Sequence, residues 1–220
     1  MKAVLFDYNG TLFADDDINA EAWIAVVNEI SQGKINAEQF YMDFIGVRNY
    51  PFVEAVFKEM GYPLDEDKIM DWAIKKETEH YQRICVRSGR RDLVPGAENL
   101  LNYLKEKQIP INLCTASLDV NVNFYFSYLN LDRWFDRNKV VYDDNICINK
   151  KDMYLKGAKS LNVDIRDTLI FDDSPASIRN AVEAGCENLV VIRKDNNPNL
   201  PQIRQRIKDF TEFDYSLLEK

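Results

Sequence analysis

The stretch AVLFDYNGTL, residues 3–12, decides the fold. Its apolar residues, 3–6, form a short run without strict alternation, which is typical of a strand buried on both faces of a sheet. Asp7 follows this run directly, and Gly10 allows the backbone to turn sharply beside it. Because α/β folds bind ligands outside the carboxyl ends of such strands, Asp7 is a candidate functional residue. An aspartate that ends a strand before a glycine turn is also an ordinary structural feature. Other motifs must therefore decide whether Asp7 has a function.

Strand and helix patterns alternate from about residue 95 onward. This alternation predicts an α/β fold, an open, doubly wound and mostly parallel sheet with helices on both faces and a crevice at the carboxyl ends of the strands. The predicted strands are 3–6, 111–115, 140–142, 168–171 and 189–192. The predicted helices of this part are 97–107, 152–161 and 177–184, with a final amphipathic helix at 203–210 after a surface loop at 194–202.

The first strand is separated from the next strand–helix unit by about 80 residues. This interval is too long for a crossover, and it contains helical periods at 20–30, 37–45, 52–60 and 67–81 with enough aromatic residues for a small core. We therefore expect two domains. Residues 1–14 and 93–220 would form the α/β core, and residues 15–92 would form a helical cap inserted over the crevice.

Composition indicates a globular protein with a substantial core, because 46% of the 220 residues are hydrophobic and 12% are aromatic. The formal net charge of -8 argues against nonspecific binding to nucleic acid or to an anionic membrane. We expect a cytoplasmic protein, because the apolar N-terminal stretch is too short for a signal peptide. The cysteines form no paired spacing, so we expect reduced and mostly buried thiols. These cysteines are Cys85, Cys114, Cys147 and Cys186. We also expect a monomer or weak dimer.

A second acidic pair, Asp172-Asp173, ends the fourth apolar run, so it should emerge at the same edge of the sheet as Asp7. Ser174 and Pro175 suit the start of the following helix, but helix capping does not require two adjacent carboxylates. Like charges about 4 Å apart repel by roughly 4 kcal/mol at an effective dielectric of 20. Converging carboxylates therefore favour a bound cation or a raised pKa, and ligands that are all oxygen favour magnesium.

Two further polar groups stand along this predicted edge. Thr115 closes the second run with a hydroxyl, and Lys150-Lys151 stand just before the helix expected from about Asp152. A hydroxyl and an ammonium group beside a bound cation are what a transferring phosphoryl group needs, because its charge is spread over several oxygens. For the two lysines taken alone, a solvated surface pair is an equally good interpretation.

These residues resemble the motifs of a known family. Asp7-Tyr8-Asn9-Gly10-Thr11, Thr115, the Lys150/Lys151 region and Asp172-Asp173 match, in order and spacing, the four motifs of the haloacid dehalogenase-like (HAD) hydrolases. The resemblance covers nearly the whole chain. With a helical insertion after the first motif, the chain looks most similar to the β-phosphoglucomutase and phosphoglycolate phosphatase branch.

The resemblance implies a fold, a reaction and a set of roles. Asp7 would be the nucleophile that forms an aspartyl-phosphate, and a lysine would neutralise it. Mg²⁺ would be bound by Asp7, by the backbone carbonyl of Asn9 and by Asp173, with Asp172 in support. The substrate would be a small phosphorylated metabolite, held in the core by Gly10, Thr11, Thr115 and Ala116. In the mutase branch a Gly-Val stretch precedes an arginine that contacts a second phosphate, so Arg48 is a candidate contact, weighed against an ordinary surface arginine.

The chain departs from the family pattern at two places. Where phosphatases carry a second aspartate, the general acid/base, this chain has Asn9, and an amide neither gives nor takes a proton in this range. Loss of general acid/base catalysis typically lowers the rate by about 10²–10⁴-fold. The usual Lys-Pro-x-Pro is also absent, so either Lys150 or Lys151 could take the lysine role, with a slight preference for Lys150.

Asn9 leaves several hypotheses open. One hypothesis is a variant made to slow turnover, and another is a natural enzyme whose substrate or water supplies the proton. Alternatively, the chain is a catalytically weak or silent relative that binds a phosphometabolite or a protein partner. Some members of the superfamily lack this aspartate and still react at the first one, so an Asp7-centred reaction remains the main hypothesis.

Overall fold

The computed structural model describes residues 1–144, 149–192 and 198–219, and the chain divides into two compact units. The core unit comprises Met1–Ala14, Arg91–Ala116 and Tyr125–Lys220. The helical unit comprises Asp15–Arg90 and Ser117–Phe124. The short segment Ser117–Phe124 thus belongs to the helical unit, whereas the sequence placed it in the core domain.

The core unit is built on a six-stranded sheet with the strand order β3-β2-β1-β4-β5-β6. Strand β1 pairs in parallel with β2 on one side and with β4 on the other, so the order of the strands reverses at β1. A doubly wound α/β fold binds its ligands at such a reversal. The predicted fold class is confirmed. The strands are β1 (Ala3–Phe6), β2 (Ile111–Leu118), β3 (Val141–Asp143), β4 (Thr168–Asp172), β5 (Leu189–Ile192) and β6 (Ile203–Ile207).

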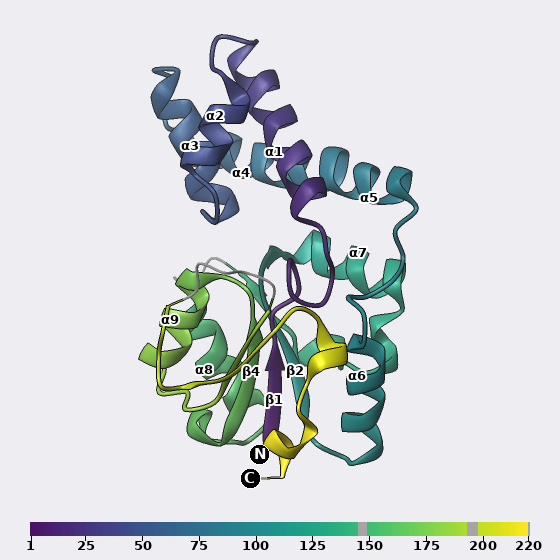
Figure 1. The fold of residues 1–220 in the computed structure, drawn as a ribbon. Helices are drawn as coiled ribbons and strands as arrows, with labels where there is room; N and C mark the ends of the chain where they lie inside the picture. Colours follow the sequence, from purple (N-terminus) through teal and green to yellow (C-terminus); the bar gives the residue numbers. More distant parts are fainter. Residues whose placement is uncertain (145–148, 193–197, 220) are drawn as a thin grey trace. The chain divides into compact units, whose positions relative to one another are not determined.

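Both faces of the central strand are buried, as its unbroken apolar run predicts. Leu5 packs into an apolar cluster with α8 and α9, whereas Phe6 stacks on Phe171 with ring centroids 5.0 Å apart and lies 6.3 Å from the ring of Phe210. Figure 1 shows α8 and α9 on one side of the sheet and α6 on the other. The helices are α6 (Ala97–Glu106), α8 (Lys150–Ser160) and α9 (Pro175–Glu183), together with α7 (Asp119–Leu129), which begins in the helical unit.

The predicted final helix at 203–210 is wrong, because residues Ile203–Ile207 form strand β6, paired in parallel with β5. Arg204 and Arg206 are exposed while Ile207 is buried. Two isoleucines four residues apart fit a helical period, but they also fit the two-residue period of a strand, which the alternating arginines follow. Of the predicted loop at 194–202, residues 194–197 lie outside the described residues.

Helix α8 begins at Lys150, earlier than the predicted start near Asp152. The side chain of Asn149 caps it by accepting a hydrogen bond from the Asp152 amide at 3.1 Å. This difference decides the geometry of the site, because it places Lys150 in the first turn of the helix. Three of the cysteines, Cys85, Cys114 and Cys186, are buried free thiols, and Cys147 lies outside the described residues.

The helical unit has an apolar core in which Trp23 stacks on Phe52 with ring centroids 4.0 Å apart. Among the described residues, every helix falls short of the length and apolarity that a membrane span requires. The predicted helix at 67–81 is interrupted, since its last turn is a π-helix. The elements are α1 (Asp16–Ser31), α2 (Ala37–Asp43), α3 (Asn49–Glu59), α4 (Glu66–Lys75), the π-helical turn η1 (Lys76–Tyr81) and α5 (Gln82–Ser88).

The π-helical turn buries an ion pair, in which Lys76 Nζ lies 3.2 Å from Glu77 Oε1. Lys76 also donates to Asn19 Oδ1 at 2.6 Å, and Asn49 donates to Glu77 Oε1 at 2.8 Å. Asn121 donates to the second oxygen of Glu77, which ties the start of α7 into the helical unit. Buried charges are tolerated when they are paired and hydrogen-bonded. Removal of one member of this network would therefore leave another buried charge without its partner and destabilise the helical unit.

We predict that Glu77→Ala destabilises the protein by about 3–5 kcal/mol, because it leaves Lys76 charged and without its buried counter-ion. Urea unfolding followed by tryptophan fluorescence measures this, since Lys76 Nζ lies 4.7 Å from the centre of the Trp23 ring. Arg87→Ala is the matched control, because it removes an exposed ion pair with Glu21 in the same unit and should cost at most about 1 kcal/mol. Equal losses for the two variants would contradict a structural role for the network.

Candidate functional site

The loop after β1 is a tight turn in which one backbone carbonyl accepts several hydrogen bonds. The oxygen of Tyr8 accepts hydrogen bonds from the amides of Thr11, Leu12 and Phe13 at 2.9 to 3.2 Å. Gly10 has a φ of 76°, and a Cβ at this position would lie 2.6 Å from Asp173 Oδ2. Only glycine allows both the positive φ and this close approach. The turn therefore lets Asp173 reach the end of β1.

Strand register brings the acidic residues to one edge of the sheet. Phe6 is paired with Phe171, and the Asp7 amide donates to the Phe171 carbonyl at 3.0 Å. One carboxylate oxygen from each of Asp7, Asp172 and Asp173 lies within 4.8 Å of the others, and all three side chains are buried. The hydroxyl oxygen of Thr11 lies 3.2 Å from Asp7 Oδ2 and 3.3 Å from Asp173 Oδ1. The three carboxylates therefore form one cluster around the reversal point of the sheet.

The cluster is electrostatically unbalanced. Burial, followed by the charge of Asp7, raises the pKa of Asp172 to about 7. Lys150 supplies one positive charge, whereas the three carboxylates carry up to three negative charges. A divalent cation bound between them would remove this imbalance, and the ligand atoms on offer are the oxygens that Mg²⁺ prefers. The described residues thus fit a magnesium site.

Lys150 is the lysine that reaches the cluster. Its Nζ contacts Asp7 Oδ1, donates to the Cys114 carbonyl at 2.6 Å and lies 3.8 Å from Asp172 Oδ2. Burial by itself would lower the pKa of Lys150, but the charges of Asp7 and Asp172 outweigh it and raise the pKa. Lys150 is therefore charged at neutral pH. Lys151, half-buried in the same turn, makes no ion pair with the described carboxylates of the cluster.

Tyr154, one helical turn after Lys150, is a site residue that was not predicted from the sequence. Its hydroxyl donates to Asp172 Oδ2, and its side chain is fully buried. Burial and the charges of Asp172 and Asp7 raise the pKa of this phenol well above its usual range, so it remains a donor. Residues four apart share a helix face. A helix that begins at Lys150 therefore places Tyr154 on the same face as Lys150, and this spacing could have indicated that Tyr154 belongs to the site.

Thr115 and Asn9 form a second polar group beside the cluster. The Thr115 hydroxyl lies 3.5 Å from Asn9 Oδ1, and Asn9 Nδ2 donates to the hydroxyl of Tyr125 at 3.1 Å. Tyr125, on α7, was not predicted from the sequence. Ala116 follows Thr115 on β2 and is partly buried. Thus the core unit brings together the side chains of all four predicted motifs.

Arg48 belongs to the helical unit, where it directly precedes α3 and is half-buried. Its suggested contact with a substrate phosphate stays a prediction.

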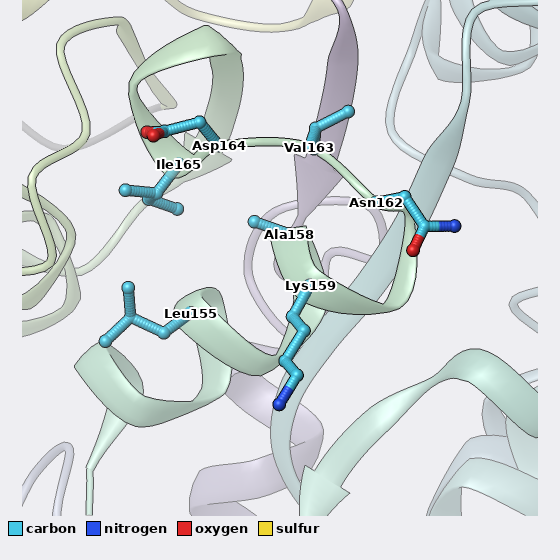
Figure 2. Close-up of a pocket in the computed structure, with 7 residues that line it drawn as sticks. All are labelled: Leu155, Ala158, Lys159, Asn162, Val163, Asp164 and Ile165. Atoms are coloured by element: carbon cyan, nitrogen blue, oxygen red, sulfur yellow. The ribbon is translucent and has the colours of Figure 1, made fainter.

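A surface groove of about 490 Å³ lies near the C-terminal end of α8, lined by Leu155, Ala158, Lys159 and residues 162–165. Figure 2 shows these side chains around it. The cluster of carboxylates has no residue in this lining, so the groove and the candidate site are separate features of the core unit.

The family model described as haloacid dehalogenase-like hydrolase matches residues 1–185. The chain belongs to this family of hydrolases. It is 26% identical over 191 residues to the phosphorylated carbohydrates phosphatase of Thermotoga maritima, covering 86% of this chain and 84% of that protein. The structure is similar to a family IA, variant 3 HAD hydrolase from Entamoeba histolytica, with a TM-score of 0.86, 28% identity and coverage of 98% and 96% of the two chains.

The same fold occurs in a β-phosphoglucomutase from Clostridium difficile. The TM-score is 0.80 with 20% identity, and the alignment covers 100% of this chain and 96% of that one. The predicted resemblance to HAD hydrolases is therefore confirmed at the level of family and fold.

Helix α8 lies very close to β2, and this close packing allows Lys150 to reach Asp7. We predict that the missing Cβ of Gly157 permits the close packing of α8 on β2. A Cβ at position 157 would collide with Cys114 Sγ. Gly157→Ala should therefore destabilise the protein by about 1–3 kcal/mol through overpacking, even though alanine favours a helix by about 1 kcal/mol.

Chemical denaturation of Gly157→Ala, Cys114→Ala and the double variant measures this. The double variant should recover most of the lost stability, because the second change removes the colliding sulfur. A double variant as unstable as the sum of the two single ones would contradict the close approach.

Proposed function

We propose that this chain is a magnesium-dependent phosphatase or phosphotransferase that acts on a small phosphate monoester through an aspartyl-phosphate on Asp7. The observation that carries the proposal is the contact of Lys150 with Asp7 inside a buried cluster of three carboxylates at the reversal point of the sheet. Membership of the HAD-like hydrolases supports it. The name of the Thermotoga maritima relative favours a phosphorylated sugar as the substrate class.

Asp7 is the proposed nucleophile. Its carboxylate would attack the phosphorus atom, the bond from phosphorus to the ester oxygen would break, and water would then hydrolyse the acyl phosphate. Lys150, held between Asp7 and the Cys114 carbonyl, would pair with the carboxylate of Asp7 and offset charge on the phosphoryl oxygens. The Thr115 hydroxyl would donate to one of these oxygens. Gly10, Thr11 and Ala116 would line the place where the phosphoryl group binds. Arg48 would contact a second anionic group of the substrate, away from the reacting phosphate.

The magnesium ion would be held by Asp7, Asp173 and the Asn9 carbonyl, with Asp172 supporting them. When bound, it would neutralise charge on the phosphoryl group. Asp172 is restrained for its part by Tyr154 and by the Ser174 amide, which donates to its Oδ1 at 2.8 Å. These contacts engage both oxygens of Asp172, which supports Asp7 and Asp173 as the proposed direct carboxylate ligands.

Asn9 favours a second candidate function. Because a carboxamide cannot transfer a proton in this reaction, the leaving oxygen and the attacking water would need another proton donor and acceptor, and turnover would be slow. A chain with this residue could instead bind a phosphorylated metabolite or a protein partner without turning it over. In the proposed metal site residue 9 contributes its backbone carbonyl and not its side chain, so binding and turnover can be tested separately.

We predict that Asn9→Asp raises turnover of phosphate monoesters by about 10²–10⁴-fold in the presence of Mg²⁺, because it restores a proton-transferring group. Phosphate release from a panel of sugar phosphates and other small esters measures this in both proteins. Asp7→Asn is the negative control, and it should abolish activity and weaken Mg²⁺ binding.

Turnover by Asn9→Asp alone would identify a phosphatase disabled at one position. No turnover in either protein, with Mg²⁺ bound in both, would favour the binding function. Unchanged turnover in Asp7→Asn would remove Asp7 from the nucleophile role.

A second prediction separates the two adjacent lysines. Lys150→Gln should lower kcat by at least about 10²-fold, because it removes the charge beside Asp7 and the phosphoryl group. Lys151→Gln, a matched change one residue further along α8, should leave kcat within a factor of about two. Equal losses, or a larger loss in Lys151→Gln, would reassign the lysine role.

A further inference from the structure

The ring of Tyr125 is fixed by the same loop that carries the candidate nucleophile. Its ring stacks on that of Tyr8 with centroids 3.8 Å apart and an interplanar angle of 18°. Tyr8 is in turn stacked on Phe13, with centroids 5.9 Å apart. All three side chains are buried. Because Tyr8 directly precedes Asn9 and Phe13 follows it by four residues, aromatic packing sets the position of the Tyr125 hydroxyl relative to residue 9.

That hydroxyl contacts both ends of the Asn9 carboxamide. Asn9 Nδ2 donates to it at 3.1 Å, and it lies 3.4 Å from Asn9 Oδ1. The Thr115 hydroxyl lies 3.5 Å from the same Oδ1. Two hydroxyls on different elements, α7 and β2, therefore restrain a side chain that is only half-buried. The terminal torsion of an asparagine is broad and roughly two-fold, so contacts of this kind influence the direction of its carboxamide.

We propose that Tyr125 is a positioning residue that sets the direction of the side chain at position 9, whether this is asparagine or aspartate. A phenol hydroxyl is both donor and acceptor, so it accepts from the amide of Asn9 and would donate to the carboxylate of an aspartate. The inference rests on the proposed function, in which residue 9 stands where proton transfer to and from the substrate takes place. It explains how an acid/base placed at position 9 would act without rearrangement of the loop.

The ring and the hydroxyl of Tyr125 have separable effects. Phenylalanine would keep the stacking on Tyr8 and fill the same buried volume, so Tyr125→Phe removes the hydroxyl and with it the contacts with residue 9. Tyr128→Phe is the matched control, because it removes a hydroxyl from the same helix three residues further on. A difference between these variants reports on the hydroxyl of Tyr125 alone.

The kinetic test is a double-mutant cycle. We expect Tyr125→Phe to lower kcat about tenfold in the Asn9→Asp background, the equivalent of one well-placed hydrogen bond, with KM changed by less than about twofold. In the natural background the loss should be at most about threefold, because Asn9 transfers no proton. Tyr128→Phe should change kcat by less than about twofold in either background.

An equal loss in both backgrounds would overturn the proposal, since it would make Tyr125 merely structural. A loss confined to the natural background would also overturn it, since the phenol would then act without residue 9.

A second measurement does not depend on turnover. In ¹H–¹⁵N spectra, the side-chain amide signals of Asn9 are assigned by their disappearance in Asn9→Asp. In the natural protein these protons should exchange slowly with water, and in Tyr125→Phe they should exchange at least about tenfold faster, while Tyr128→Phe leaves them unchanged. Unchanged Asn9 signals in Tyr125→Phe would overturn the positioning role. If no variant has activity but the signals change as expected, the proposed function fails and the positioning role stands.

Discussion

Three carboxylates share one buried place in this protein, and much of the local structure serves to hold them there. Like charges at about 4 Å repel by roughly 4 kcal/mol at an effective dielectric of 20. Burial, and after it the charge of Asp7, raises the pKa of Asp172 to about 7. Lys150 offsets part of the repulsion, Tyr154 donates to Asp172, and the missing Cβ of Gly10 leaves room for Asp173. A fold that only needed stability would not keep such a cluster, because well-packed apolar residues are often at least as stable.

The backbone features that bring these groups together could be read from the sequence. The predicted strands at 3–6 and 189–192 coincide with β1 and β5, because strands buried on both faces leave continuous apolar runs that end at polar residues. Once the strands are parallel, their carboxyl ends meet at one edge, so the proximity of Asp7 and Asp173 followed from topology alone. The prediction of a helix at 203–207 was wrong because this segment is an edge strand whose two isoleucines, four residues apart, also fit a helical period.

Side-chain partners on helices could not be predicted in the same way. Tyr154 is indistinguishable from a core tyrosine until the first turn of α8 is known, and that start depends on the cap formed by Asn149. Tyr125 lies on a helix whose apolar residues surround it, so no periodicity singles it out. The choice between Lys150 and Lys151 likewise required the helix to be placed, since a shift of one residue rotates a side chain by about 100°. The four motifs were predictable, and the contacts that orient them were not.

The most direct test of a cation site at the strand ends is a crystal structure grown with Mn²⁺ in place of Mg²⁺ and with inorganic phosphate, using anomalous scattering to locate the metal. The account predicts one strong peak at coordination distance, about 2.0–2.2 Å, from a carboxylate oxygen of Asp7 and one of Asp173, with the phosphate beside Thr115 and Lys150. A peak at other residues, or no peak at a saturating metal concentration, would contradict it.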